Sequence, residues 1–409
     1  MVRAKLTAID MPNFAPDFLF AVLTFAGLLL VVARAYMTRG LPYALFATVM
    51  LGVHGCTAVV VFPALGWLQP VAALLQIVTI VHFLLLSKPR MRSLTYRALV
   101  SIPGSAFVAA MFLSMPWALA LLLGFDPWLI WLPWLIAAAS VVKSLTTKVE
   151  DINLVLDGRP VGDLARVDPG VRRLTRSLSI VQITDPHLGP FMSVERLHAI
   201  CARAVEKNPD LILLTGDYLT MESNSTPGAL AAALEPLKEL EGRVFASMGN
   251  HDHEAPEEVR SGLESNGIKL LIDESVVVDT EAGWVQIVGA DHVWRGRAEH
   301  LADVVEKNPR VPGALRILLL HDPSAFPHLP EGEGDLVLSG HTHGGQLGLL
   351  DLGLDWTVLS GLKAVPDHGF WGLGTNRLYV HRGTGHYGFP LRIGVPAEES
   401  VLRVHKLPT

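Results

Sequence analysis

LSGHTHGGQ, residues 338–346, is the stretch that decides how the larger part of this 409-residue chain folds. A short apolar run ends at Leu338, and two histidines, His341 and His343, follow it within five residues. The glycines around them are typical of a tight loop. An apolar strand followed directly by a polar loop is the place where open α/β sheets hold their ligands. The stretch therefore predicts a binding site at the end of a buried strand.

Four blocks upstream have the same arrangement, in which an apolar run ends in Asp, Asn or His. One such block is compatible with an ordinary turn, because Gly, Asp and Asn are common turn residues. Five blocks in order are not explained by turn chemistry, so we interpret them as parts of a single site. The four are ITDPHLG (183–189), LLTGDY (213–218), MGNHDH (248–253) and LLLHDP (318–323).

The polar side chains of the five blocks form a set suited to binding metal ions. Mixed nitrogen and oxygen ligands favour Zn, Fe or Mn over Ca, which prefers oxygen alone. Seven ligands are too many for one ion that must also bind water, but they suit two ions that share a bridging group. Asp217 is the natural bridge, because its two carboxylate oxygens can reach both ions. The candidate ligands are Asp185, His187, Asp217, Asn250, His321, His341 and His343.

Between the blocks, short β-like runs alternate with amphipathic stretches, which predicts a layered α/β domain over residues 177–409. Residues 146–176 are interpreted as a linker; its basic cluster, Arg172, Arg173 and Arg176, fits either a patch against anionic lipid headgroups or a solvated turn. Helices are expected at 194–206 and 229–240. Strands are expected at 178–183, 211–214, 244–248, 276–278, 284–288, 317–320, 336–338 and 378–380.

Residues 1–145 have a different composition from the rest of the chain. They contain nine Lys or Arg and three Asp or Glu, a net charge of +6, whereas the remaining residues carry −12. Five apolar runs lie near 18–33, 43–65, 71–86, 98–123 and 128–142, and a helix needs about 20 apolar residues to cross a bilayer. We therefore predict an N-terminal α-helical transmembrane bundle of about five spans. This excludes a single soluble domain, and the acidic larger domain argues against a nucleic-acid-binding surface.

The charged residues between the runs predict the orientation of the bundle. Basic residues follow the first, third and fifth runs, and the positive-inside rule places such loops in the cytoplasm. Arg3 and Lys5 oppose this assignment. We expect a multi-pass protein of the cell membrane with a cytoplasmic C-terminal domain. The residues that carry this prediction are Arg34, Arg39, Lys88, Arg90, Arg92, Arg97, Lys143 and Lys148.

Two histidines, His54 and His82, lie inside apolar runs. They could form a proton relay or a metal pair, since ionisable groups within a membrane are often functional. Hydrogen bonds between helices are the favoured interpretation, because two histidines without a carboxylate make a poor relay.

The five blocks resemble the calcineurin-like metallophosphoesterases, and the resemblance covers about 178–403. GHTHGGQ and the segment LYVHRGTGHYGFPLRIGVPAE (378–398) are similar to the branch that contains the YaeI- and YkuE-type phosphodiesterases. Several spans followed by such a domain also resemble the animal transmembrane proteins with a metallophosphoesterase domain. The resemblance implies a four-layered αββα sandwich that binds two divalent metal ions.

The resemblance also implies a role for each residue. Asp185, His187 and His343 would bind the first ion, Asn250, His321 and His341 the second, and Asp217 both. His251 would act as general acid or charge stabiliser, oriented by Asp252. Pro186 departs from the family, which usually has an aliphatic residue there. We expect its ring to push Asp185 into an extended conformation.

Other polar residues near the motifs match no ligand position. We interpret four histidines as neighbours of the site or as surface residues: His253, His292, His381 and His386. Arg382 and Arg392 are equally compatible with contact to a substrate phosphate and with structural ion pairs.

These expectations describe a membrane-anchored, two-metal phosphohydrolase, best read as a phosphodiesterase or pyrophosphatase. A hydroxide that bridges the two ions would attack phosphorus in line. Attachment to a membrane favours a lipid-linked substrate by effective concentration. The resembling branch implies UDP-2,3-diacylglucosamine as one candidate.

The expected partners are the lipid bilayer and a phosphorylated substrate, with no nucleic acid and no obligate protein partner inferred. The alternative is a sensor or transporter whose soluble domain only binds a metal or ligand. Ligands at all five blocks disfavour it, because a domain that had lost catalysis would be expected to lose some of them.

Overall fold

A computed structural model describes residues 14–170, 177–362 and 365–406. The basic cluster Arg172, Arg173 and Arg176 lies outside the described residues, as do Arg3 and Lys5. The chain divides into two units. The first contains residues up to 88 together with 94–138, and the second contains residues 89–93 together with 139–409.

The regular secondary structure of the first unit is all helical in the residues that the structure describes. Its helices follow from long apolar runs that contain almost no charge, so their backbone groups bond within each helix. The elements are α1 (Phe14–Arg39), α2 (Leu41–Val61), η1 (Phe62–Leu68), α3 (Gln69–Leu86), α4 (Leu94–Tyr96), η2 (Arg97–Ser101), α5 (Ile102–Leu113), α6 (Met115–Leu122) and the start of α7 (Leu132–Ser144).

Three helical stretches are long and apolar enough to cross a membrane: Pro16–Arg39, Leu41–Leu86 and Leu94–Leu113. The second is 46 residues long and contains both α2 and α3. η1 joins these two helices, and within it Gly66 has a non-helical φ of 54°. Leu132–Ser144 is a shorter apolar helix. The five spans and their orientation stay predictions.

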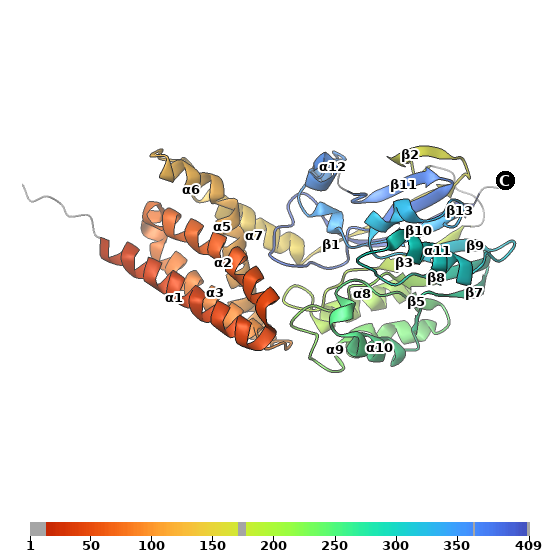
Figure 1. The fold of residues 1–409 in the computed structure, drawn as a ribbon, viewed down its shortest axis with the longest axis horizontal. Coiled ribbons are helices and arrows are strands. Elements are labelled where there is room, and N and C mark those ends of the chain that lie inside the picture. The colour runs from red at the N-terminus through yellow and green to blue at the C-terminus, as the bar shows by residue number, and fades with distance from the viewer. Residues whose placement is uncertain (1–13, 171–176, 363–364, 407–409) are drawn as a thin grey trace, which may run out of the picture. The chain divides into compact units, whose positions relative to one another are not determined.

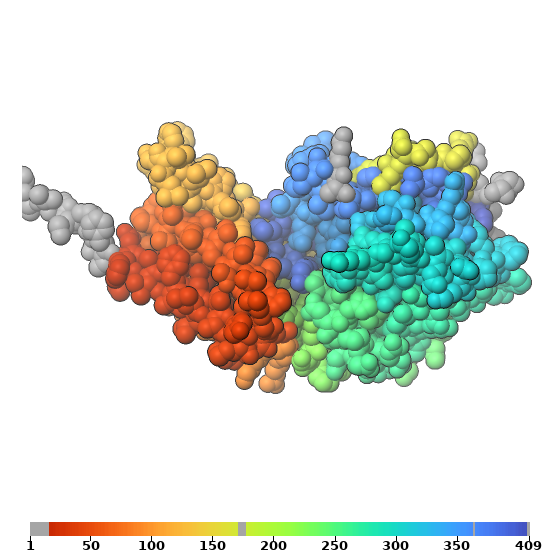
Figure 2. Space-filling view, in the orientation of Figure 1, coloured from red at the N-terminus to blue at the C-terminus, as the bar shows by residue number. Residues whose placement is uncertain are grey.

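Apolar side chains cover the outer surface of this unit, as expected of helices that face lipid. On α1, which is red in Figure 2, Phe18, Leu29 and Leu30 are all more than half exposed. The two histidines are buried and bond between helices. His54 Nε2 lies 3.0 Å from Gln76 Oε1, and His82 Nε2 lies 3.4 Å from Ser105 Oγ. Both contacts agree with the interpretation of these histidines as inter-helix hydrogen-bonding groups.

The second unit is an α/β sandwich of two mixed sheets (Figure 1). In the first sheet, β3 to β6 run parallel, and β13 joins them in the antiparallel direction. Its strands, in spatial order, are β1 (Thr147–Leu156), β13 (Ala397–Lys406), β3 (Leu178–Ile183), β4 (Leu211–Leu214), β5 (Val244–Ala246) and β6 (Lys269–Leu270).

The second sheet has a parallel centre with antiparallel edges. Its strands, in spatial order, are β2 (Val161–Arg166), β11 (Gly369–Gly374), β12 (Asn376–Val380), β10 (Leu336–Ser339), β9 (Leu315–Leu319), β8 (Gly283–Gly289) and β7 (Glu274–Thr280).

Helices pack on the outer faces of both sheets. The first sheet is covered by α8 (Val194–Glu206), α9 (Ala229–Leu234), η3 (Glu235–Leu240) and α10 (Pro256–Glu264), and the second by α11 (Arg297–Lys307) and η5 (Pro323–His328). A separate apolar cluster fills the space between the sheets, where Ile180 and Leu213 meet Ile317 and Leu338. The central strands are apolar on both faces because each faces a core on either side.

Residues 147–166 correct the sequence prediction, which interpreted this stretch as a linker. They form β1 and β2, one at the edge of each sheet. β1 pairs in parallel with β13 over ten residues, from Thr147 with Ala397 to Leu156 with Lys406. Edge strands are partly exposed and contain polar side chains. β1 and β2 therefore lack the continuous apolar run by which the central strands were recognised in the sequence.

Candidate metal centre

All five blocks lie in loops that leave the sheets, at the ends of β3, β4, β5, β9 and β10. The loops are strained. Outside glycine, the described residues include nine with positive φ, and five of these are candidate ligands: Asp185, His187, Asp217, His341 and His343. A left-handed conformation is costly for residues with a Cβ atom, and it persists only where the surroundings enforce it. Such strain concentrated on the predicted ligands marks this edge as a functional site.

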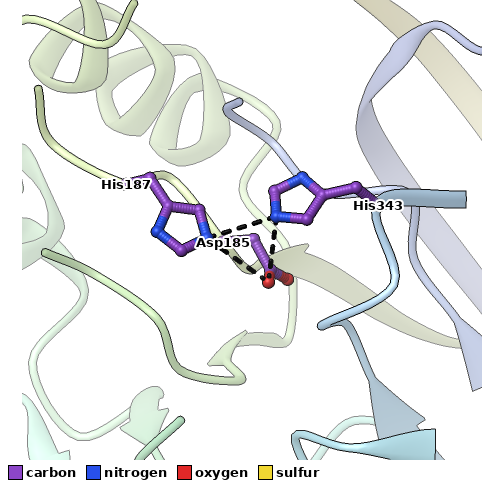
Figure 3. Close-up of side chains that lie close together, drawn as sticks. All are labelled: Asp185, His187 and His343. Carbon is purple, nitrogen blue, oxygen red and sulfur yellow. Dashed lines mark hydrogen bonds and ion pairs between the residues drawn. The ribbon is translucent and has the colours of Figure 1, made fainter. Parts of the chain in front are cut away.

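The first donor group joins Asp185, His187 and His343 (Figure 3). His187 Nε2 lies 3.2 Å from His343 Nε2 and 3.8 Å from Asp185 Oδ1. His343 Nε2 lies 3.5 Å from the same carboxylate oxygen. All three side chains are buried. Two histidines and one carboxylate therefore converge on one point.

The second donor group joins Asp217, His321 and His341. His321 Nε2 lies 3.2 Å from Asp217 Oδ2, and His341 Nδ1 lies 3.3 Å from His321 Nε2. The Nδ1 atom of His321 bonds to the backbone oxygen of Thr215 at 2.7 Å. A backbone partner at one ring nitrogen orients the other toward the site, as in many metal centres.

Asp217 connects the two groups through one oxygen atom. Its Oδ2 lies 3.7 Å from His187 Nε2 of the first group and 3.2 Å from His321 Nε2 of the second. Its Oδ1 accepts a hydrogen bond from the backbone N–H of His251 at 2.8 Å. This carboxylate occupies the place of the bridge that the sequence predicts.

The donor spacing fits divalent ions. Nitrogen and oxygen ligands bind zinc-like ions at about 2.0–2.2 Å, so neighbouring ligands of one tetrahedral ion lie about 3.3–3.6 Å apart. The separations within the two groups, from 3.2 to 3.8 Å, agree with this spacing. Side chains from four separate loops converge in this way.

Burial sets the protonation of the histidines. It lowers the pKa of His187 to about 3 and that of His343 well below the ordinary value; His341 is lowered in the same way. These rings are therefore neutral at physiological pH, the state in which imidazole binds a metal.

The carboxylates of the two groups differ. Burial, assisted by the charge of Asp217, raises the pKa of Asp185 to about 6. Burial acts on Asp217 in the same direction, but the histidines around it outweigh burial and hold its pKa well below the usual range. Burial would lower the pKa of His321, but Asp217 raises it to about 10. His321 and Asp217 thus form a buried ion pair, whose proton a metal ion can replace.

Asn250 is the one candidate ligand with an amide side chain. Its Oδ1 atom is buried and has no hydrogen-bond partner among the described residues. A buried acceptor without a partner costs free energy unless something binds it. The next residue, His251, donates its backbone N–H to Asp217 Oδ1, so the loop that carries Asn250 is bonded to the bridging carboxylate.

The partner of His251 differs from the prediction. We expected Asp252 to orient the imidazole, but His251 Nδ1 instead lies 2.8 Å from Glu254 Oε1. Burial alone would lower the pKa of His251. The carboxylates of Glu254 and Asp217 outweigh this effect, so the pKa of His251 is raised. The carboxylate of Asp252 accepts bonds from the backbone N–H groups of Asp217, Tyr218 and Gly249, at 2.7–2.9 Å. It holds two loops together because its short side chain is buried beneath them.

Asp185 is a second correction. Pro186 was expected to hold Asp185 in an extended conformation, yet its φ is 51°. Its carboxylate faces the backbone N–H of His341 (3.0 Å) and the hydroxyl of Thr184 (2.7 Å). These bonds, together with one from its own N–H to the oxygen of Gly216 at 3.0 Å, outweigh the local preference imposed by proline.

The two arginines and four histidines that match no ligand position contact other residues of the protein. Arg382 pairs with Glu398 at 2.9 Å and with Glu150, so it is held inside the fold. Arg392 is fully buried and contacts Nδ1 of His343 at 3.1 Å, which supports that ligand from behind. Among the histidines, His253 contacts Asp291, His386 contacts the oxygen of Phe389, His381 lies 3.6 Å from Glu398, and His292 packs on Trp294.

Two aromatic side chains border the site and were not predicted. The ring of Tyr387 lies 4.4 Å from that of His251 and 4.8 Å from that of His187. Trp294 lies 4.6 Å from His292, which in turn lies 6.4 Å from His321. Both are exposed, Trp294 by 70% and Tyr387 by 40%. Glu254 was also missed; its spacing of three residues from His251 was the one local signal for it.

Comparison with known proteins places these blocks in one family. The family model described as "Calcineurin-like phosphoesterase" matches residues 178–345, which contain all seven candidate ligands.

Three curated relatives are similar to more than half of this chain. "Phosphodiesterase YaeI" of Escherichia coli (strain K12) is 30% identical over 230 residues, which are 55% of this chain and 81% of the relative. "Uncharacterized metallophosphoesterase YkoQ" of Bacillus subtilis (strain 168) is 30% identical over 54% of this chain and 80% of its own length. "Transmembrane protein with metallophosphoesterase domain" of Danio rerio is 30% identical over 57% of this chain and 55% of its own length.

Proposed function

The chain belongs to the calcineurin-like phosphoesterase family, and on this premise we propose that it is a membrane-anchored phosphodiesterase that uses two metal ions. Family membership makes it a metal-dependent phosphoesterase and confirms the resemblance seen in the sequence. The observation that carries the two-metal proposal is the position of Asp217 Oδ2, within 3.7 Å of one donor group and 3.2 Å of the other.

We assign the ligands as the family resemblance implies. Asp185, His187 and His343 would hold one ion, and Asn250, His321 and His341 the other, with Asp217 shared. The donor set suits Mn, Fe or Zn. When bound, such a pair supplies positive charge to the phosphoryl oxygens and acidifies water at neutral pH.

The residues of the chain orient the substrate and move a proton. Glu254 occupies Nδ1 of His251, which leaves Nε2 as the ring nitrogen that meets a phosphate oxygen. His251 donates a proton to the leaving oxygen or stabilises its charge. Asp252 holds the loop of Asp217 against the loop of Gly249, so the bridging carboxylate and His251 keep a fixed separation.

We propose a diester or pyrophosphate with an organic group on each side of phosphorus. The support is the pair of exposed rings, Tyr387 beside the first donor group and Trp294 near the second. Aromatic rings of this kind stack on flat or apolar groups. A lipid-linked or nucleotide-lipid substrate such as UDP-2,3-diacylglucosamine satisfies this requirement.

The basic residues after the first, third and fifth apolar runs support a cytoplasmic catalytic domain, which we also propose. Homologues with transmembrane segments and the three membrane-long helices support membrane association.

Turnover by the purified full-length chain with Mn²⁺ tests the activity. We expect hydrolysis of bis(p-nitrophenyl) phosphate to exceed that of p-nitrophenyl phosphate, because the monoester lacks the second aryl group. The control is Asp217→Asn, which keeps the side-chain volume and removes the bridging charge. Wild-type turnover no higher than that of this variant would overturn the proposal.

A further inference from the structure

A leucine-rich loop, residues 349–362, follows the candidate metal centre directly. Between residues 147 and 409, the structure describes eleven exposed large hydrophobic side chains, and six of them lie in this loop. Single exposed apolar residues are ordinary, but a gathered group indicates a contact surface. The six are Leu349, Leu352, Leu354, Trp356, Val358 and Leu362.

The backbone of this loop is well defined. Leu349 N–H donates to the oxygen of Trp356 at 2.9 Å, and Val358 N–H donates to that of Leu347 at 2.9 Å. Within it, Leu350–Leu352 forms η7 and Val358–Leu362 forms α12. The apolar side chains are therefore presented outward by a hydrogen-bonded scaffold.

The base of the leucine-rich loop is polar and buried. The Thr357 hydroxyl bonds to Asp367, whose carboxylate also pairs with Arg166 at 2.8 Å. Above it Asp355, whose side chain is exposed, contacts the buried His368 at 2.7 Å. Burial would raise the pKa of Asp367, but His368, Thr357 and Arg166 lower it to about 2. The loop thus has a charged, tightly bonded base below an apolar outer face, like an amphipathic element that lies on a membrane.

The loop also contacts the end of the last apolar helix. Lys143, in the final turn of α7, pairs with Asp351 at 2.8 Å. Val142 beside it is 60% exposed. A lysine at the end of an apolar helix is typical of the boundary between hydrocarbon and headgroups. The ion pair therefore ties the loop to the polar end of this apolar helix.

We propose that residues 349–362 insert their apolar side chains into the interfacial layer of the bilayer that holds the N-terminal helices. Trp356 suits this layer, since its ring is apolar and its N–H is polar. The occupant is lipid rather than a second copy of the chain, because the Lys143–Asp351 pair ties the loop to the polar end of an apolar helix, where lipid headgroups are the expected neighbours. A methyl group on Gly345, two residues after His343, would lie 3.0 Å from the side chain of Leu359, so the loop packs against the metal motif. Insertion therefore holds the metal centre close to the membrane surface.

The test measures depth and does not depend on catalysis. The full-length chain, with Cys56 and Cys201 changed to alanine, receives a single Leu352→Cys substitution and an environment-sensitive nitrobenzoxadiazole label. It is reconstituted in nanodiscs of palmitoyl-oleoyl phosphatidylcholine, with or without dibrominated phosphatidylcholine. Leu362→Cys, at the other end of the loop, gives a second reporter should the first variant fail to fold. The matched control is Val277→Cys, an exposed apolar position on β7.

We expect blue-shifted emission and about twofold quenching by bromine at 352 and 362, with no quenching at 277, because an inserted label lies among the acyl chains. Absence of bromine quenching at both loop positions overturns the proposal. If the emission is then red-shifted, the loop faces water; if it is blue-shifted, protein covers the loop. The emission and quenching of the label do not depend on phosphodiesterase activity. A failure of the proposed activity can therefore be distinguished from a failure of membrane insertion.

Discussion

His251 depends on Glu254, the residue three positions further along the chain. Their contact of 2.8 Å fixes the imidazole, and the carboxylate raises its pKa against the effect of burial. A proton donor needs both a fixed direction and a proton at working pH. Asp252 was expected in this role, but a side chain that is buried under two loops cannot also reach an imidazole at the surface of the site.

We expect His251→Gln to lower kcat for an aryl phosphodiester by about 100-fold or more, as for the loss of other general acids. Glu254→Gln should lower it by about tenfold, since the ring keeps its place but loses its charge partner. Steady-state kinetics of the full-length chain measure both. His253→Gln is the matched control, two residues away, and should change kcat little. Equal losses in all three variants would contradict the role given to His251.

The seven candidate ligands can be picked out in the sequence because each block follows an apolar strand and the five blocks recur in order. The contacts that these residues receive from distant parts of the chain could not be predicted. Arg392 contacts His343 across 49 residues, and Tyr387 packs on His251 across more than 100. Nothing local in either segment signals the contact, since it arises only when the sheets form.

At the scale of elements, the loops after β4 and β5 depend on a close approach of their backbones. Gly216 has φ of 91°, and a Cβ atom there would lie 2.3 Å from the backbone nitrogen of Gly249. A backbone atom cannot give way as a flexible side chain can. The glycine in TGD therefore serves the packing of two loops that carry Asp217 and Asn250.

Gly216→Ala should destabilise the domain by about 3 kcal/mol or more, because backbone strain and overpacking add. Gly242→Ala is the comparison, with a similar φ of 83° and open space around it, and should cost about 1–2 kcal/mol. Urea unfolding of the full-length chain in detergent, followed by a domain tryptophan signal, compares the two. Equal destabilisation would show that the loops do not approach as described.

Several elements have the same bounds in the structure as in the sequence prediction, among them two strands that are buried on both faces. β3, β4 and α8 have the bounds expected from the sequence, 178–183, 211–214 and 194–206. β1 and β2 were missed because they are edge strands with charged residues. Their partners, β13 and β11, lie about 200 residues or more further along the chain, so no local turn signal marks the pairing.

At the scale of the whole catalytic unit, a buried charge cluster joins the two sheets. Glu398 on β13 and Glu150 on β1 both bind Arg382, which follows β12 of the second sheet. Burial raises the pKa of Glu398, but His381 and Arg382 outweigh it and lower the pKa to about 2, against an ordinary value of 4.5. Because the folded pKa is lowered, the stabilisation is present above pH 4.5 and is lost as pH falls toward 2.

That shift corresponds to a contribution on the order of 3 kcal/mol at neutral pH. We expect Glu398→Gln to lower the thermal midpoint of the full-length chain at pH 7, and the gap from wild type to narrow as pH falls from 4.5 to 3. Differential scanning fluorimetry in detergent follows both proteins. Asp279→Asn, at an exposed position of β7, controls for general loss of charge. A difference in thermal midpoint that stays constant from pH 4.5 to 3 would contradict the lowered pKa of Glu398.

The most direct test of the account is the metal content of the whole chain. The full-length protein is loaded with Mn²⁺, freed of excess ion and measured by inductively coupled plasma mass spectrometry beside Asp217→Asn. The position of Asp217 between the two donor groups predicts about two ions per wild-type chain and fewer than one in the variant, because both ions lose their shared ligand. One ion or none in the wild type, or two ions retained in Asp217→Asn, would contradict a metal pair bridged by this carboxylate.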